Sequence, residues 1–432
     1  MKKVLIVTPH WPPLSYPDIH RIRVALGFFH TFGWQPLILT VDPDEDDGVK
    51  DSLLRDSIRS EQKEWIATCI PRKFTSWLGI NSPALRGLFQ IYRLGNEIIK
   101  QEQPDLIFFS TTMFFVMPLG RIWLGQFSIP YVLDFQDPWF NEYIGEKNAL
   151  TRSLKYKVSN FIARVLEPFT LKNSIGVISV SQKYIDVFCK RYSWLSKEDC
   201  LLLPFSAASE DIGYLVKNDI KQQIFTPGDG NIHWCYVGRG GSDMAFALRG
   251  FFKALRSAIG QEPGRYPNLV LHFIGTDYAS GTRAQKTIEP LANEFGLGKM
   301  VIESTERLPY FEALRCLLDA DALIVPGSDD PGYSASKIYP YILAKKPLLT
   351  IFHEESLIVK VMQETNAGIS VCFNENDDTK ALSKNVFDAW FRSFPPETPE
   401  INWKAFSKYS AKEMTRRICE FFDRCLERRP DL

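Results

Sequence analysis

Apolar segments that read as strands alternate with amphipathic helical segments along most of the chain, and this alternation constrains the fold most. The first strand, Val4–Val7, is followed by a helix after His20 and by a second strand over Leu37–Val41. These strand segments are almost continuously apolar, which is typical of parallel strands buried on both faces. Strand, helix and strand in this order predict a doubly wound α/β fold.

The alternation occurs twice, before and after a polar linker that contains Asn231. We expect further strands at 105–110, 130–135, 175–180 and 201–205, and then at 232–237, 269–274, 300–303, 322–325 and 347–352. A length of 432 residues agrees with two or three domains. The sequence therefore predicts one α/β domain over 1–205, a second over 206–400, and a helical segment over 401–432.

Composition excludes several classes of protein. A hydrophobic content of 45% with 13% aromatic residues is enough for large cores, which excludes a disordered chain. The 51 basic residues are balanced by 51 acidic ones, whereas nucleic-acid-binding proteins usually carry a basic excess. The 8 cysteines are scattered, without zinc-like spacing, so we expect no metal site. Such thiols suit a reducing, cytoplasmic compartment.

No targeting or membrane-spanning segment is expected. The apolar segment after Lys3 is interrupted at Pro9, which makes it too short for the core of a signal peptide. The most apolar window, 106–124, contains Pro118 and Arg121. It is therefore a poor candidate for a transmembrane helix, which needs about 20 apolar residues.

A glycine-rich turn, Gly238–Ser242, joins the strand at 232–237 to a helix predicted over 244–257. A turn of this kind presents backbone N–H groups and the positive end of a helix dipole to an anion. Arg239 adds a guanidinium that suits bidentate pairing with a pyrophosphate. The alternative is a tight turn with a surface arginine.

The stretch Ser334–Pro347 follows a strand and an acidic loop, and it reads as a helix start, a short helix and a new strand. Loops at the carboxyl ends of strands are where open α/β sheets bind ligands. The hydroxyl groups of Ser334 and Ser336 suit phosphate binding and helix capping equally well. Lys337 is either a phosphate contact or a solvated lysine.

Several segments, taken in this order, resemble glycosyltransferase family 4, whose members have the GT-B fold. They are IPYVLDFQDPW (129–139), YVGR (236–239), LPY (308–310) with ADALIVP (320–326), and SKIYPYILAKKP (336–347). The first is similar to the Asp-Phe-Arg-Asp-Pro-Trp segment of bacterial surface-polysaccharide members. The resemblance implies two Rossmann-like domains that face a central cleft, a nucleotide-sugar donor in the second domain and an acceptor in the first. It further implies that the C-terminal helix, over 401–432, crosses back to the first domain. It also implies a retaining reaction that needs no metal or cofactor.

The resemblance assigns donor binding to residues of the second domain, with two departures from the family pattern. Asp243 and Met244 stand where the family often has a lysine, and Pro340 stands where a glutamate holds the ribose hydroxyls. A proline side chain accepts no hydrogen bond. Asp329 and Asp330 are candidates for a position near the donor sugar; the alternative is that both are solvated loop carboxylates. The implied donor residues are Gly238, Arg239, Gly240, Gly241, Asp329, Asp330, Ser334, Ser336, Lys337 and Ile338.

In the first domain the resemblance points to the end of the strand at 130–135. Asp134 and Asp137 are the candidate catalytic carboxylates, because a partly desolvated carboxylate accepts a proton from an acceptor hydroxyl. Capping of the next turn is the alternative role. The implied acceptor or cleft residues are Arg21, His20, Gln136 and Trp139, of which Trp139 suits either sugar stacking or core packing. The family's first loop is glycine-rich, whereas Asp18 and Ile19 stand there in this chain, and a β-branched residue disfavours a close backbone approach.

Basic and aromatic side chains mix over 71–94, and Lys155, Lys157 and Arg164 add positive charge. This mixture is typical of peripheral docking to a membrane surface, and lipid-linked acceptors are common in the family. An ordinary amphipathic helical hairpin is the alternative.

The resemblance predicts a retaining glycosyltransferase that transfers a hexose from a UDP- or GDP-linked sugar to a saccharide or lipid-linked acceptor. The expected role is bacterial cell-surface polysaccharide synthesis, in the cytoplasm or on the cytoplasmic face of the inner membrane. A non-catalytic GT-B protein that acts as a partner in the same pathway is the main alternative. An NAD-dependent enzyme is disfavoured, because no convincing ribose-binding acidic residue follows the glycine turn at a spacing of about 20 residues.

Overall fold

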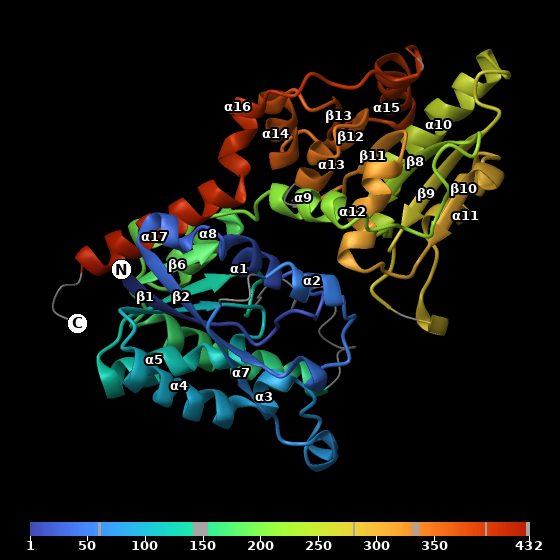
Figure 1. Cartoon of the computed structure of the whole chain (residues 1–432). Coiled ribbons are helices and arrows are strands. Elements are labelled where there is room, and N and C mark those ends of the chain that lie inside the picture. Colours follow the sequence, from blue (N-terminus) through green and yellow to red (C-terminus); the bar gives the residue numbers. More distant parts are fainter. Residues whose placement is uncertain are drawn as a thin grey trace. The chain divides into compact units, whose positions relative to one another are not determined.

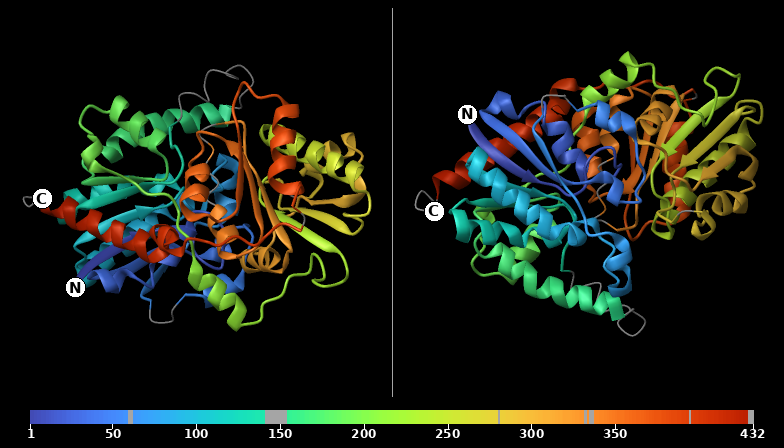
Figure 2. Two further views of the ribbon diagram at one scale, coloured as in Figure 1. Left: turned by 90° about the horizontal axis from the view of Figure 1, so that it is seen from above. Right: turned by 60° about the horizontal axis from the view of Figure 1, so that its bottom comes forward.

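The computed structural model describes residues 1–58, 62–140, 154–279, 281–330, 333, 337–393 and 395–428. The chain forms two compact units (Figures 1 and 2). The first unit combines Met1–Ser206 with Ala411–Leu432, and the second unit is Ala207–Ser410. Each unit is a parallel sheet with helices packed on it, so the predicted two-domain α/β fold is confirmed.

The first unit contains a sheet of seven parallel strands in the order β3-β2-β1-β4-β5-β6-β7. Successive residues of β1 enter opposite cores: Val4 and Ile6 join one, and Leu5 and Val7 join the other. This explains why the strand is apolar throughout. The strands are β1 (Lys2–Val7), β2 (Trp34–Val41), β3 (Glu64–Ala67), β4 (Leu106–Ser110), β5 (Tyr131–Phe135), β6 (Gly176–Ser179) and β7 (Cys200–Leu202).

Helices cover both faces of this sheet. One core includes side chains of α1 (Ile19–Ala25) and α17 (Ala411–Glu427), so the C-terminal helix belongs to the first unit. The other core includes side chains of α4 (Leu88–Glu102), α5 (Pro118–Phe127), α7 (Leu154–Leu171) and α8 (Gln182–Arg191). Helices α4 and α5 pack closely at Gly95, where an added Cβ would lie 2.2 Å from the ring of Trp123.

The second unit contains six parallel strands in the order β10-β9-β8-β11-β12-β13, which repeats the topology of the first unit. In both sheets the strand order reverses next to the first strand, which is where doubly wound folds bind ligands. The strands are β8 (Ile232–Val237), β9 (Leu269–Ile274), β10 (Val301–Ser304), β11 (Ala322–Pro326), β12 (Leu348–His353) and β13 (Ile369–Phe373). The helices are α9 (Ser209–Lys217), α10 (Ala245–Gln261), α11 (Ile288–Glu294), α12 (Tyr310–Asp319), α13 (Ile338–Leu343), α14 (Leu357–Thr365), α15 (Thr379–Val386) and α16 (Trp403–Phe406).

Some elements differ from the prediction. The helix expected over 83–100 is divided at Gly87 into α3 (Pro83–Arg86) and α4, while α2 (Ser52–Asp56) and strand β3 lie in a region where the sequence shows little pattern. All 8 cysteines are free thiols. Among the residues that the structure describes, no helix is long and apolar enough to cross a membrane.

Candidate functional site

The glycine turn after β8 lies at the carboxyl edge of the second sheet, but two of its N–H groups are already bonded. Gly238 N–H donates to the carbonyl of Ile274 at 2.9 Å, and Gly240 N–H donates to that of Thr276 at 2.7 Å. This corrects the expectation that these two N–H groups face an anion. Gly241 has a φ of 147°, a region that favours glycine. These two hydrogen bonds hold the turn against the end of β9 and the loop that follows it.

Arg239 extends from this turn and is already paired. Its guanidinium donates to both carboxylate oxygens of Asp243, at 2.9 and 2.6 Å, and it lies 4.6 Å over the ring of Tyr333. The hydrogen bonds from Arg239 lower the pKa of Asp243 despite its partial burial. An incoming phosphate therefore has to compete with Asp243 for this arginine.

A tyrosine of α13 takes the place of a strand neighbour beside the turn. Strands β8 and β11 pair at Trp234 with Ala322 and at Cys235 with Leu323, which are the middle residues of β8 and the first two residues of β11. Further along, the Tyr341 hydroxyl accepts from Val237 N–H at 2.7 Å and donates to the Val237 carbonyl at 3.0 Å. The backbone N–H and carbonyl groups of Val237 are thus both hydrogen-bonded where the two strands have separated, at the switch point.

Two further cations lie at this edge. Arg307 follows β10, is exposed, and lies 4.0 Å over the ring of Tyr278 from the loop after β9. Lys337 is also exposed, and desolvation together with the charges of Arg307 and Arg239 lowers its pKa to about 8. Among the described residues, neither Arg307 nor Lys337 has a carboxylate partner.

The other predicted donor residues have different surroundings. Asp329 and Asp330 are exposed on the loop after β11, which is tied to the glycine turn where Asp329 N–H donates to the Asp243 carbonyl at 2.9 Å. Ile338 is fully buried in the core, which makes it a packing residue and corrects its assignment to donor binding. Ser334 and Ser336 lie outside the described residues. Helix α13 has six residues, and Pro340 is its third.

In the first unit, three predicted residues come together in a buried network. Arg21 Nε lies 2.7 Å from Asp134 Oδ2, and both side chains are fully buried. Ser110 Oγ and Gln136 Nε2 also donate to Asp134, at 2.8 and 3.0 Å. Burial raises the pKa of Asp134, and the charge of Arg21 and the hydrogen bonds counter part of that rise. A buried, paired carboxylate does not reach an acceptor, so the structure corrects the catalytic assignment of Asp134 and the assignments of Arg21 and Gln136 to the acceptor side.

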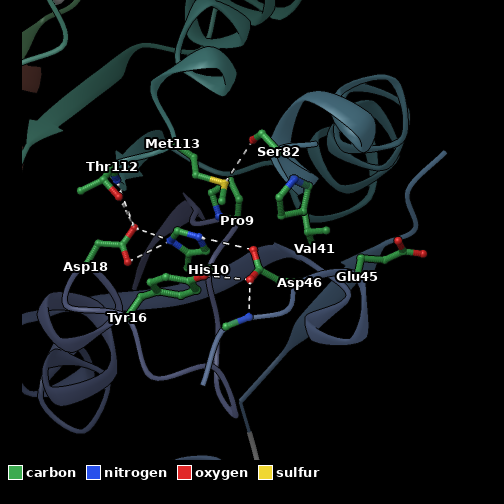
Figure 3. A network of polar contacts seen from close by, with 12 residues as sticks. Pro9, His10, Tyr16, Asp18, Val41, Glu45, Asp46, Ser82, Thr112 and Met113 are labelled. Atoms are coloured by element: carbon green, nitrogen blue, oxygen red, sulfur yellow. Dashed lines mark hydrogen bonds and ion pairs between the residues drawn. The ribbon is translucent and has the colours of Figure 1, made fainter. Parts of the chain in front are cut away.

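A second network in this unit centres on His10, which lies in the loop after β1 (Figure 3). His10 Nδ1 lies 3.0 and 2.9 Å from the two oxygens of Asp18, and the ring stacks on Tyr16 with centroids 4.0 Å apart. Thr112 donates to Asp18 through its N–H and its hydroxyl, at 3.1 and 3.0 Å. On the far side of the ring, His10 Nε2 lies 4.0 Å from Asp46. The network joins the proline-rich loop after β1 to the loops after β2 and β4.

Asp137 remains the accessible carboxylate of the predicted pair. It is exposed after β5, and its pKa is raised by desolvation and by the charge of Asp18. Trp139 stacks on Phe114 with ring centroids 5.5 Å apart, so packing within the unit occupies one of its faces. His20 lies on the first turn of α1 and contacts Arg23 at 3.2 Å.

The basic and aromatic set over 71–94 is partly buried. Arg86 is buried and donates to Glu45 at 2.7 Å, so it belongs to the interior. Phe74, Trp77 and Phe89 are exposed, as is Arg93. The side chains of Leu78, Lys155 and Lys157 lie outside the described residues, whereas Arg164 is exposed on α7.

The sequence prediction missed His10, Asp18, Tyr278, Arg307 and Glu303. Position offers a signal for His10 and Asp18, because both lie in the loop that joins β1 to α1, at the switch point of the sheet. Buried Glu303 accepts from Thr276 and from the first N–H groups of α11, which is a tertiary contact that no local pattern shows. Within the described part of the chain, no cluster of His, Cys, Asp and Glu is arranged to hold a metal ion.

No protein-family model and no curated protein sequence matches the chain. Several solved structures do match the chain. A glycosyltransferase from Rickettsia africae matches with a TM-score of 0.57 at 14% identity, over 99% of each chain. Anabaena HepE, solved with UDP and glucose, matches with a TM-score of 0.57 at 14% identity, over 98% of this chain and 100% of that one. The chain has the GT-B fold.

A third GT-B structure, WaaG, is a glycosyltransferase involved in lipopolysaccharide biosynthesis. It matches with a TM-score of 0.50 at 15% identity, over 98% of this chain and 99% of that one. Likenesses at this level of identity show the GT-B fold alone. Membership of family 4, and of its surface-polysaccharide subgroup, stays a prediction.

Proposed function

We propose that the chain is a retaining glycosyltransferase that transfers a hexose from a UDP- or GDP-linked sugar to a saccharide or lipid-linked acceptor. The observation that carries the proposal is the group of cations at the carboxyl edge of the second sheet. Arg239, Arg307 and Lys337 come from three different loops, and the charges of the two arginines contribute to the lowered pKa of Lys337. A diphosphate bound there relieves this repulsion.

The loops around these cations suit a nucleotide-sugar. Tyr278 is largely exposed beside Arg307 and offers an aromatic face to a base or sugar, while Asp329 and Asp330 offer acceptors for sugar hydroxyls. HepE, which shares the fold, was solved with UDP and glucose.

On the acceptor side, Asp137 is the proposed proton acceptor. Its raised pKa and exposure suit a carboxylate that takes a proton from a hydroxyl. In the proposed transfer, the acceptor oxygen bonds to the anomeric carbon, the bond from that carbon to the diphosphate breaks, and the nucleoside diphosphate leaves with the electron pair. The proposed reaction needs no cofactor.

We place this activity in bacterial cell-surface polysaccharide synthesis, in the cytoplasm or peripherally on the cytoplasmic face of the inner membrane. The support is the sequence resemblance to surface-polysaccharide enzymes and the shared fold of WaaG.

A non-catalytic GT-B protein of the same pathway is the second candidate. Two observations favour it: Asp243 already holds Arg239, and Pro340 stands where a ribose-binding carboxylate is expected. Turnover of a nucleotide-sugar by the purified chain, abolished in Arg239→Ala, excludes this candidate.

A thermal-shift series with UDP, GDP and their sugars tests the proposed function first, because a ligand that binds only the folded state raises Tm by mass action. We expect one nucleotide class to raise Tm, and we expect Arg307→Ala to remove the shift. Lys299→Ala is the matched control, since Lys299 lies before β10, at the opposite edge of the sheet. No shift with any nucleotide, together with no donor hydrolysis, contradicts the proposal.

A further inference from the structure

Helix α7 exposes an apolar stripe on its outer side. Val158, Phe161, Ile162, Val165 and Phe169 are all exposed, with Phe161 67% and Val165 53% accessible. The spacing of three, four and seven residues places these side chains on one face of the helix. Such a row, exposed on a single helix, is typical of an interaction surface.

The orientation of α7 is fixed by its inner side. Glu167 is fully buried, where it accepts from Arg191 at 2.5 Å and from the Tyr192 hydroxyl at 2.8 Å. The Tyr131 hydroxyl donates to the Thr170 carbonyl at 2.6 Å, and Ala163 is buried as well. These contacts of the inner side fix the rotation of α7 about its axis, so the apolar stripe faces outward.

The charge around the stripe is positive. Helix α5, which packs beside α7, contains no carboxylate, and Glu167, buried, is the only carboxylate in the sequence of α7. Arg164 and Lys172 are exposed, and Arg121 of α5 lies 4.3 Å over the ring of Phe169. This excess is local, because the whole chain has a net charge of zero.

We propose that the outer face of α7 docks on an anionic lipid surface, with the apolar stripe entering the headgroup region and the basic residues contacting lipid phosphates. Helices α4, α5 and α7 lie together on one side of their unit, and Figure 2, right, shows α7 in green along the outer side of that unit. A helix with an apolar outer face and flanking Lys and Arg residues is the form that binds in the plane of an interface. The proposal deepens the proposed function, because it names the surface through which a lipid-linked acceptor is reached.

The favoured occupant is lipid and not a second copy of the chain. A self-complementary protein interface usually pairs its cations with carboxylates, and α5 and α7 offer no exposed carboxylate in their described residues. Anionic headgroups supply the missing charge, at roughly 1 kcal/mol for each Lys or Arg near the surface.

Co-sedimentation with vesicles tests the proposal on the full chain. We expect binding to phosphatidylcholine vesicles that contain phosphatidylglycerol, weaker binding to phosphatidylcholine alone, and a decrease at high salt. Phe161→Ser with Val165→Ser should lower the partition constant by on the order of tenfold for each side chain. Val216→Ser, which changes a 61% exposed valine on α9, is the matched control and should leave binding unchanged.

Three outcomes overturn the proposal: no vesicle binding by the unmodified chain, equal binding by the double variant, or a lipid-independent dimer that the double variant dissolves in sedimentation velocity. The result is separable from the proposed function. Nucleotide binding measured without vesicles is expected to be the same in the double variant and the unmodified chain, so failure of either proposal leaves the other testable.

Discussion

The guanidinium of Arg239 contacts both carboxylate oxygens of Asp243, four residues later in the same turn, at 2.9 and 2.6 Å. The arginine is the residue that the sequence pattern offers to a pyrophosphate. Its partner stands near the place where a second cation is expected from the resemblance. The net charge presented to an anion by this turn is therefore close to zero, and the positive charge of the edge comes mainly from Arg307 and Lys337.

Removing the charge of Asp243 should strengthen donor binding. Asp243→Asn frees the guanidinium for the diphosphate, and we expect the Kd for the nucleotide-sugar to fall by about 3- to 10-fold, since a half-exposed ion pair contributes only about 1 kcal/mol. Calorimetry measures this change. Asp388→Asn breaks a comparable Arg–Asp pair at Arg392 and should leave the Kd unchanged. A weaker Kd in Asp243→Asn shows instead that Asp243 orients Arg239 for binding.

Donor affinity should depend on pH through Lys337. Its pKa is lowered to about 8, so the side chain is charged below that pH and becomes neutral above it. An anion binds best to the charged form of Lys337, so we expect the Kd to rise as pH increases through about 8. Bound phosphate stabilises the protonated lysine, so the rise should continue above that pH. Calorimetry across this range tests the effect. Lys337→Arg should flatten the dependence, and an unchanged profile in that variant assigns the titration to another group.

Asp134 should act on stability and not on chemistry. Asp134→Ala leaves Arg21 buried without its ion-pair partner, and we expect the free energy of unfolding to fall by about 3–5 kcal/mol. Urea denaturation measures the loss. Asp423→Ala, which breaks the exposed pair with Lys2, is the control and should cost about 1 kcal/mol or less. If Asp134→Ala keeps full stability but loses turnover, the prediction is wrong and Asp134 is a catalytic residue.

Asp18 should make the first unit sensitive to acid. Burial alone raises the pKa of this carboxyl, but His10 and Thr112 outweigh burial and hold the pKa below its usual value. A lowered pKa gives stability that is present above the unfolded value of about 3.9 and is lost as pH falls through the folded value. We therefore expect Asp18→Asn to lower Tm at neutral pH and to flatten its decline below about pH 4.

Asp44→Asn, at an exposed carboxylate in the loop after β2, is the control for this measurement. If Tm falls as steeply at acid pH in Asp18→Asn as in the unmodified chain, Asp18 is not the group that makes the first unit sensitive to acid.

The sequence predicts every central strand of both sheets, and it also predicts the edge strands β7 and β10. β1, β2, β4, β8 and β11 are apolar on both faces because they are covered by helices on both sides, and this burial leaves a local signal. The edge strand β3 has an exposed isoleucine and a half-buried tryptophan, so its apolar pattern is weak. The sequence analysis predicts no strand at β13, which forms one edge of the second sheet.

The candidate site is predicted less well, since its chemistry depends on tertiary contacts. The position of Arg239 after β8 is visible in the sequence, but its pairing with Asp243 and the bonded N–H groups of Gly238 and Gly240 are not. Arg307 belongs to no motif, and only the parallel sheet brings its loop to the edge where Lys337 lies.

The central claim is that the edge with Arg239, Arg307 and Lys337 binds the diphosphate of a nucleotide-sugar. Titration calorimetry with UDP- and GDP-linked sugars tests it most directly. We predict saturable binding of one donor class that weakens by about tenfold or more in Arg307→Ala and in Lys337→Ala, and that is unchanged in Lys299→Ala. Binding that is equally strong in all three variants, or no binding of any donor by the unmodified chain, contradicts the account.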